Sequence, residues 1–284
     1  MYSQGCGGSS PPFGTKDSSN NTLSMSTQLE QILAHTQLEV AARRAASGLP
    51  LLERRAAAHT PRGFEDALRR ARPAIIAELK KASPSRGLIR PDFDPSALAR
   101  SLESAGAAAL SVLTDEKFFQ GSLENLTLAS SAVSIPCLCK GFILDPFQVL
   151  EARAACADAI LLIVAALADA DLKTLRDEAR HMELDVLCEV HDRAELARAA
   201  ALGFTVIGVN SRNLHTMLVQ PQTQLELAEW LPRDAVHVAE SGIQSAADIA
   251  RLRSFGYHAF LIGESLMRQP DPAAALTSLL EQAQ

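Results

Sequence analysis

The sequence predicts an α/β fold: a closed (β/α)8 barrel of the TIM type, preceded by helices. Eight short apolar runs follow residue 73, and helix-length amphipathic segments separate them. The runs begin about 26 residues apart on average, which suits the strand–helix units of a roughly 250-residue barrel. An open doubly wound sheet is the alternative, but no GxGxxG motif follows the first run. The closed barrel is therefore the prediction.

The part of the chain before the first strand divides into a tail and helices. We expect residues 1–24 to form a disordered tail, because 14 of them are Gly, Ser, Pro or Asn. We expect residues 25–284 to form one barrel domain, which includes N-terminal helices within residues 28–71. The first helix is predicted over residues 28–46, where apolar residues recur near helical spacing. Two shorter helices are predicted at 51–58 and 64–71.

The expected strands are apolar and short, as buried parallel strands are. Helices that end at Gly106, Gly203 and Gly256 separate several of them, as C-terminal glycines commonly do. The strands are predicted at residues 74–80, 108–114, 134–140, 158–164, 184–190, 204–210, 235–240 and 258–263.

Composition excludes several classes of protein. The net charge is −6 and the chain holds few aromatic residues, so we expect no nucleic-acid partner. The longest apolar run, residues 159–168, is too short to cross a bilayer, and the N-terminus lacks the pattern of a signal peptide. We therefore expect a cytoplasmic protein with no membrane partner, monomeric or at most a weak dimer.

Cysteine and histidine spacing predicts neither a disulfide framework nor a metal site. The five cysteines form no CxxC pair, and no two histidines lie close together in sequence. We expect no metal.

Polar residues gather where the predicted strands end. In a (β/α)8 barrel this rim carries the active site, and we expect few polar groups at the opposite rim. Glu78 and Lys80 lie two residues apart, so both side chains point to the same face of their strand. Six polar residues end predicted strands, and together they can supply an acid, a base and an anion contact. They are Glu78, Lys80, Lys140, Glu189, Asn210 and Glu240.

Glycines follow the last two strands, where this fold commonly binds phosphate. Gly242 and Gly263 allow tight turns that expose backbone N–H groups, and Ser83 and Ser241 add hydroxyl donors. We expect a phosphorylated small molecule as substrate.

Several motifs together resemble indole-3-glycerol phosphate synthase. They are IAELKKASPSRGLI (76–89), SVLTDEKFFQGS (111–122), CKGFILDPFQ (139–148), VIGVNSRNL (206–214), VAESGI (238–243) and LIGESLM (261–267). The resemblance begins near Leu29 and reaches the last helix. It implies a barrel whose N-terminal helical extension lies over the mouth, and we expect the first helix to cover the phosphate end.

The resemblance implies a cofactor-free reaction. The family closes the pyrrole ring of indole from 1-(2-carboxyphenylamino)-1-deoxyribulose 5-phosphate, with loss of carbon dioxide and water, in tryptophan biosynthesis. Lys140 matches the general acid, and neighbouring groups can lower the pKa of such a lysine. Glu189 matches a later base or acid. Lys80 matches a group that contacts the substrate carboxylate and assists dehydration. The division of proton transfers among these three stays open.

The remaining positions match groups that orient or bind the substrate. Glu78 and Asn210 orient the reacting groups, and Glu240 lies with Ser241 beside the glycerol phosphate. The binding positions are Ser83, Gly242, Gly263 and Glu264 for phosphate, Arg212 for the carboxylate, and Phe119 and Phe142 for the aromatic ring.

The chain departs from the family pattern at three positions. Gly141 stands where Asp commonly follows the lysine, and Ser211 and Asn213 replace residues of an NNRDL motif. A phosphate-binding barrel with lost or weak catalysis is therefore an alternative. An isomerase of the same pathway is a second one, but its cysteine–aspartate pair does not appear at these strand ends.

Overall fold

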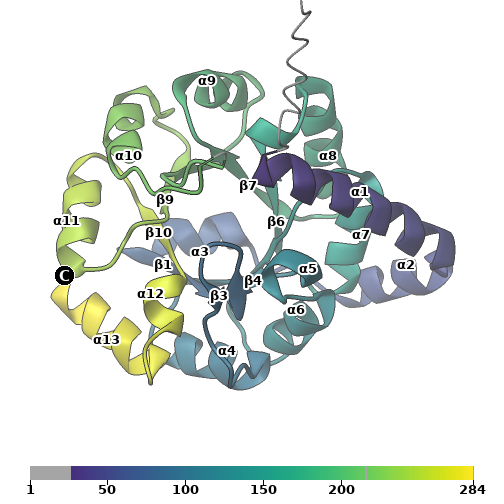
Figure 1. Ribbon diagram of the computed structural model, residues 1–284, viewed down its shortest axis with the longest axis horizontal. Coiled ribbons are helices and arrows are strands. Elements are labelled where there is room, and N and C mark those ends of the chain that lie inside the picture. Colours follow the sequence, from purple (N-terminus) through teal and green to yellow (C-terminus); the bar gives the residue numbers. More distant parts are fainter. Residues whose placement is uncertain (1–26, 215, 284) are drawn as a thin grey trace, which may run out of the picture.

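Eight parallel strands close into a barrel, in the order β1–β10–β9–β8–β7–β6–β5–β4 around the ring (Figure 1). The computed structural model describes residues 27–214 and 216–283, so the expected tail lies outside it. Each strand falls within its predicted apolar run, and the predicted TIM barrel is confirmed. The bounds are Ala74–Leu79 (β1), Ala109–Leu113 (β4), Cys137–Lys140 (β5), Ala159–Ile163 (β6), Asp185–Val190 (β7), Val206–Asn210 (β8), Val236–Glu240 (β9) and Ala259–Ile262 (β10).

The outer helices follow the strands in turn. Three begin at an Asp-Pro pair, in which the Asp carboxylate accepts backbone N–H groups of the first turn and proline occupies that turn. The helices are α4 (Pro95–Ser104), α6 (Leu123–Ser130), α7 (Pro146–Ala154), α8 (Asp169–His181), α9 (Arg193–Ala201), α10 (Gln222–Leu227), α11 (Ala246–Ser254) and α13 (Pro272–Gln282).

Short elements decorate the loops. The pairing β2–β3, an antiparallel ladder of two residues per strand after β1, was too short to predict. In the described ranges, no helix has the length and apolar character needed to cross a membrane. The short elements are β2 (Ala82–Ser83), β3 (Gly87–Leu88), α5 (Glu116–Phe119), α12 (Glu264–Met267) and the 3-10 turns η1 (Val164–Ala166) and η2 (Ala228–Trp230).

The N-terminal extension forms three helices: α1 (Gln28–Ala46), α2 (Leu49–Ala58) and α3 (Phe64–Arg70). The predicted bounds of α1 are confirmed. Helix α2 begins two residues earlier than predicted, because Pro50 fits the first turn of a helix, where its missing N–H breaks no helical hydrogen bond. Helix α1 lies at the mouth of the barrel and α2 packs against α7 (Figure 1).

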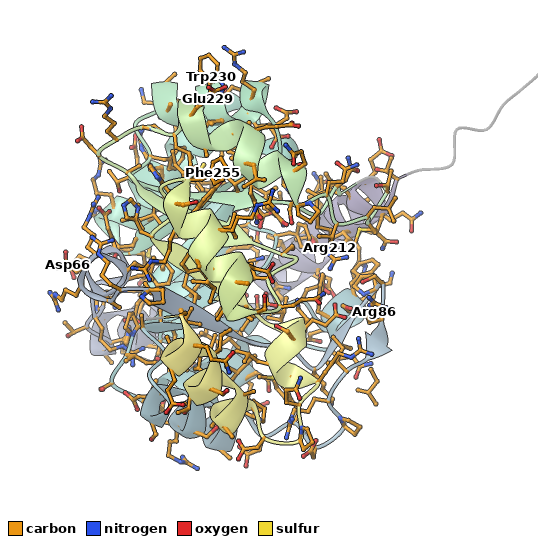
Figure 2. All side chains as sticks on the ribbon, turned by 90° about the vertical axis from the view of Figure 1, so that its left-hand side faces the viewer. Asp66, Arg86, Arg212, Glu229, Trp230 and Phe255 are labelled. Atoms are coloured by element: carbon orange, nitrogen blue, oxygen red, sulfur yellow. The ribbon has the colours of Figure 1, made fainter. Side chains whose placement is uncertain are left out.

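Helix α3 closes the opposite end of the barrel. Phe64 and Leu68 are fully buried in one apolar cluster with inward-facing strand residues such as Leu138. The backbone N–H of Glu65 donates to Asp185 at the start of β7. Figure 2 shows Asp66, also in α3, at the far end of the molecule from Arg86 and Arg212. The extension therefore serves both ends of the barrel, and only α1 belongs to the mouth.

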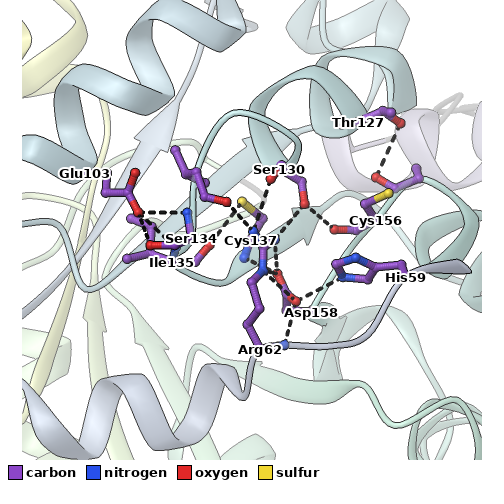
Figure 3. A network of polar contacts seen from close by, with 12 residues as sticks. His59, Arg62, Glu103, Thr127, Ser130, Ser134, Ile135, Cys137, Cys156 and Asp158 are labelled. Carbon is purple, nitrogen blue, oxygen red and sulfur yellow. Dashed lines mark hydrogen bonds and ion pairs between the residues drawn. The ribbon is translucent and has the colours of Figure 1, made fainter.

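The expectation of few polar groups at the rim opposite the mouth, where the strands begin, is wrong. Asp158, fully buried before β6, accepts hydrogen bonds from the Arg62 side chain, from the Arg62 backbone and from the N–H of Cys137 (Figure 3). The Arg62 guanidinium also donates to the carbonyl oxygens of Ser130 and Val133. Other protein groups satisfy the hydrogen bonds of the Asp158 carboxylate and the Arg62 guanidinium. The network therefore ties the N-terminal extension to the barrel.

Candidate active site

A cavity of about 790 Å³ opens at the carboxyl ends of the strands. Because it lies where β1, β5, β7, β8 and β9 end, it collects polar side chains from distant parts of the sequence. All fourteen residues singled out from the sequence line it: Glu78, Lys80, Ser83, Phe119, Lys140, Phe142, Glu189, Asn210, Arg212, Glu240, Ser241, Gly242, Gly263 and Glu264.

Lys140 stands at the centre of the charged groups. Its Nζ atom donates to Oε2 of Glu189 at 3.4 Å and lies 3.6 Å from Oε2 of Glu240. Both carboxylates are almost completely buried. Glu240 packs so closely over Gly208 that a Cβ atom there would collide with its carboxylate. The lysine is therefore held between two carboxylates that the barrel wall fixes in place.

A second lysine–carboxylate pair lies beside the first. Lys80 and Glu78 form an ion pair, which confirms that their side chains share the inner face of β1. The Glu78 carboxylate packs against the backbone of Gly263, where a Cβ atom would overlap it. Gly263 is thus required for space.

The carboxylates keep Lys140 charged. Burial alone would lower the pKa of the ammonium, but Glu189, Glu240 and Glu78 outweigh burial and raise it. The neighbours of Lys140 therefore raise its pKa, because three carboxyl groups converge on one lysine. Burial would likewise raise the pKa of Glu189, but Lys140 and His191 lower it instead. Glu189 is an ionised carboxylate facing an ammonium.

Glu240 differs from Glu189 although both contact Lys140. Burial, followed by repulsion from Glu189, raises the pKa of Glu240 to about 8. Neither carboxylate oxygen of Glu240 has a hydrogen-bond donor among the described residues. Near neutral pH this group therefore carries a proton for much of the time, and two adjacent carboxyl groups hold different protonation states.

The turn after β9 presents its backbone to the cavity. Ser241 and Gly242 both have left-handed backbone angles, with φ of 66° and 77°, which is costly for the serine. The Ser211 hydroxyl donates to the carbonyl oxygens of Glu240 and Ser241, and the Gln224 amide also donates to Glu240. Ser211, one of the departures from the family pattern, thus fixes this turn.

Three arginines surround the Glu264 side chain. Arg86 Nε lies 3.0 Å from Oε1, Arg268 Nη1 lies 3.2 Å from the same oxygen, and Arg212 Nη2 lies 4.0 Å from Oε2. Figure 2 shows Arg86 and Arg212 near each other at this end of the molecule. The surroundings of Glu264 are therefore strongly cationic, as an anion site requires.

An apolar wall faces the charged groups. Phe119 and Phe142 line it, together with Leu29 and Ile32 of α1. The position of α1 differs from the expected one. Arg43 of α1 forms a two-pronged ion pair with Glu151 of α7, at 2.9 and 3.1 Å. The helix therefore lies beside the elements that follow β4 and β5, across the mouth from α12 (Figure 1). Helix α1 therefore does not lie over α12 and the adjoining turn after β10, where phosphate binding is expected.

Gly141 is restricted by space. A Cβ atom at this position would lie 2.5 Å from the Thr114 hydroxyl, while its φ lies outside the left-handed region. Glu189 and Glu240 provide the carboxylates that an Asp at position 141 would otherwise bring near Lys140.

Several residues at the site escaped the sequence prediction, among them His191 and Arg86. His191 contacts Glu189 from outside the cavity, and Arg86 contacts Glu264. Both lay inside or beside segments already singled out, since Arg86 belongs to SPSRG and His191 follows Glu189 by two residues.

Comparison with known proteins gives the family. The family model described as "Indole-3-glycerol phosphate synthase" matches residues 29–279. The chain belongs to this family. A relative with the same name from Koribacter versatilis is 62% identical over 259 residues, 90% of this chain and 100% of the relative. One from Azospirillum brasilense is 50% identical over 261 residues, with the same coverage of both chains.

Solved structures agree on the fold. The crystal structure of 3-hexulose-6-phosphate synthase from Salmonella typhimurium aligns with a TM-score of 0.59 at 12% identity, over 74% of this chain and 100% of that one. The expected family is confirmed. Two further predictions are confirmed with it: the chain is a carbon–carbon lyase of tryptophan biosynthesis, and it acts on a phosphorylated small-molecule substrate.

Proposed function

We propose that this chain closes the indole ring of 1-(2-carboxyphenylamino)-1-deoxyribulose 5-phosphate, releasing carbon dioxide and water, with the residues of the charged cluster dividing the proton transfers. The observation that carries the proposal is the position of Lys140 between Glu189 and Glu240 at the floor of the cavity. We propose that the reaction needs no cofactor and that protein groups handle every proton.

Lys140 is the group that activates the carbonyl. The charged ammonium polarises the carbonyl oxygen, and it transfers its proton to that oxygen as the ring carbon attacks. Loss of carbon dioxide then restores the aromatic ring.

The dehydration uses the other lysine and an ionised carboxylate. Lys80 donates a proton to the departing hydroxyl and contacts the substrate carboxylate, while Glu78 orients the Lys80 ammonium through their ion pair. Glu189 accepts the proton released when the double bond forms, since Lys140 and His191 keep it ionised. Asn210, at the end of β8, orients the sugar hydroxyls beside Glu189.

The rest of the cavity binds the two ends of the substrate. The phosphate accepts from Ser83 and from backbone N–H groups of Gly242, Gly263 and Glu264. The buried Ser83 hydroxyl supports this assignment, because it has no hydrogen-bond partner among the described residues. Glu240 and Ser241 lie beside the glycerol chain. Arg212 faces the carboxylate, while Phe119 and Phe142 contact the aromatic ring.

The decisive experiment is a fluorescence assay of indole product from the carboxyphenylamino substrate, in buffer containing EDTA. We expect steady turnover. Substrate binding by calorimetry with no product would instead establish the alternative, a phosphate-binding barrel without catalysis. A metal requirement would contradict the assignment of every step to protein groups.

We further propose that residues 25–284 form a single domain that acts in the cytoplasm as a monomer, with a weak dimer as the alternative. The net charge of −6 supports the absence of a nucleic-acid partner. Sedimentation equilibrium across a wide concentration range separates monomer from dimer.

A further inference from the structure

His191 lies directly behind Glu189, on the side away from the substrate. It follows the end of β7, and its Nε2 atom lies 3.2 Å from Oε1 of Glu189. Lys140 contacts the other oxygen, Oε2. Because Glu189 lines the cavity and His191 does not, the histidine reaches the reaction only through this carboxylate.

A second carboxylate holds the imidazole from its other side. The Nδ1 atom of His191 lies 3.1 Å from Oε2 of Glu195, and the same oxygen accepts the backbone N–H of His191 at 2.8 Å. Glu195 is fixed in turn, since its backbone N–H donates to Asp192, the N-cap of α9. A largely buried ring between two carboxylates is favoured as the imidazolium.

Geometry and charge agree on that state. Burial would lower the pKa of His191, but Glu189 and Glu195 outweigh burial and raise it to about 10. The Nε2 atom faces Oε1 of Glu189 at 3.2 Å, within ion-pair distance. The positive charge of this ion pair is a feature that a neutral side chain cannot replace.

The imidazolium breaks the balance between two neighbouring carboxyl groups. Lys140 faces both Glu189 and Glu240, and Glu78 adds a third negative charge that Lys80 pairs. Among the described residues, His191 is the additional cation in contact with these carboxyl groups. Of the three, it contacts only Glu189. When two carboxyl groups are adjacent, repulsion between their charges favours a proton on one of them. Because the positive charge of His191 stabilises the ionised form of Glu189, the proton resides on Glu240.

We propose that His191, held by Glu195, is a positioning residue that keeps Glu189 ionised as the base and leaves the shared proton on Glu240. The proposal rests on the proposed function for the role of Glu189. It predicts that loss of the imidazolium raises the pH below which Glu189 is protonated and stops working, without weakening substrate binding.

The test is the pH dependence of kcat/KM for His191→Gln, with His181→Gln on exposed α8 as the matched control. We express the kcat/KM of His191→Gln as a fraction of the wild-type kcat/KM at the same pH. This fraction should be at least tenfold smaller at pH 5.5 than at pH 8.5, because Glu189 of the variant becomes protonated in the acid range. KM should change less than threefold. Glu195→Gln should shift the profile in the same direction by a smaller amount, because it removes one of the two carboxylates.

Two results would overturn the proposal. One is a His191→Gln profile that parallels the wild type at every pH, even if all rates are lower. The other comes from ¹⁵N NMR of the histidine rings in the substrate-free wild type, which tests the charge without activity or mutation. A neutral His191 ring at pH 7.5 contradicts the proposal. An inactive wild type whose His191 is an imidazolium would instead count against the proposed function alone.

Discussion

Lys140 and Glu240 face each other across the full width of the barrel. They end β5 and β9, which are four strands apart in the ring of eight, and still their charged atoms lie 3.6 Å apart. A carboxylate from the opposite wall therefore partners the lysine, in a chain that has no carboxylate at the next residue, Gly141.

Gly141→Asp should change kcat by less than about tenfold, equivalent to roughly 1.4 kcal/mol. Lys140 already has the ionised carboxylate of Glu189 and the carboxyl group of Glu240 within 4 Å, so a further carboxylate adds little. Gly141→Ala is the matched control, because any side chain there meets the Thr114 hydroxyl. Steady-state kinetics across pH measures both. A hundredfold gain in Gly141→Asp would show that the existing carboxylates do not serve Lys140.

Lys140→Ala should lower kcat by about 10²–10⁴-fold, the usual contribution of a well-placed acid or base. The fold should persist, because the side chain ends at the open cavity and its loss leaves no closed core void. Lys173→Ala, on the exposed face of α8, should behave as the wild type. Circular dichroism and the indole fluorescence assay test both claims. More than a tenth of wild-type kcat in Lys140→Ala would exclude it as the main acid.

Glu189→Gln should depress kcat far more than it raises KM. The amide fills the same space but accepts no proton at neutral pH, so binding survives and the chemistry does not. Glu229→Gln, at the exposed turn η2, serves as the control. If KM alone rose in Glu189→Gln, this residue would be a binding group.

Glu240→Gln should become more stable relative to the wild type as the pH rises from 5 to 9. The folded-state pKa of Glu240 is raised to about 8, so its contribution is present below the unfolded pKa and is lost as pH rises through 8. The loss is at most about 1.4 kcal/mol per pH unit, and the amide avoids it. Melting temperatures of both proteins across this range measure the difference. A constant difference would mean that Glu240 titrates normally.

Ile32→Ala should raise KM several-fold with little change in kcat. Its side chain lines the cavity from α1, and its loss removes apolar contact worth about 1–3 kcal/mol. Leu38→Ala is the matched control, since Leu38 is 72% exposed on the same helix. Equal KM values for the two variants would show that α1 does not contact the substrate.

The strands and the charged site could be predicted because each has a local signature. A strand buried on both faces is a short apolar run, and Lys140, Glu189 and Glu240 stand out as polar residues that end such runs. The contacts of Arg62 have no such signature, since Asp158 is 96 residues away. The direction of the pKa shift of Lys140 has no local signature either, because it depends on carboxyl groups from three other strands.

Helix α3 also bears on the order in which the chain assembles. Phe64 and Leu68 fill the base of the barrel, and Arg69 donates to the carbonyl oxygen of Asp234, 165 residues later. On the ribosome, a segment made early must wait for β9 before this contact forms. Pairings so distant in sequence slow folding. The first and last thirds of the chain therefore complete one another, and a nascent chain that stops before β9 leaves the apolar face of α3 without its final partners.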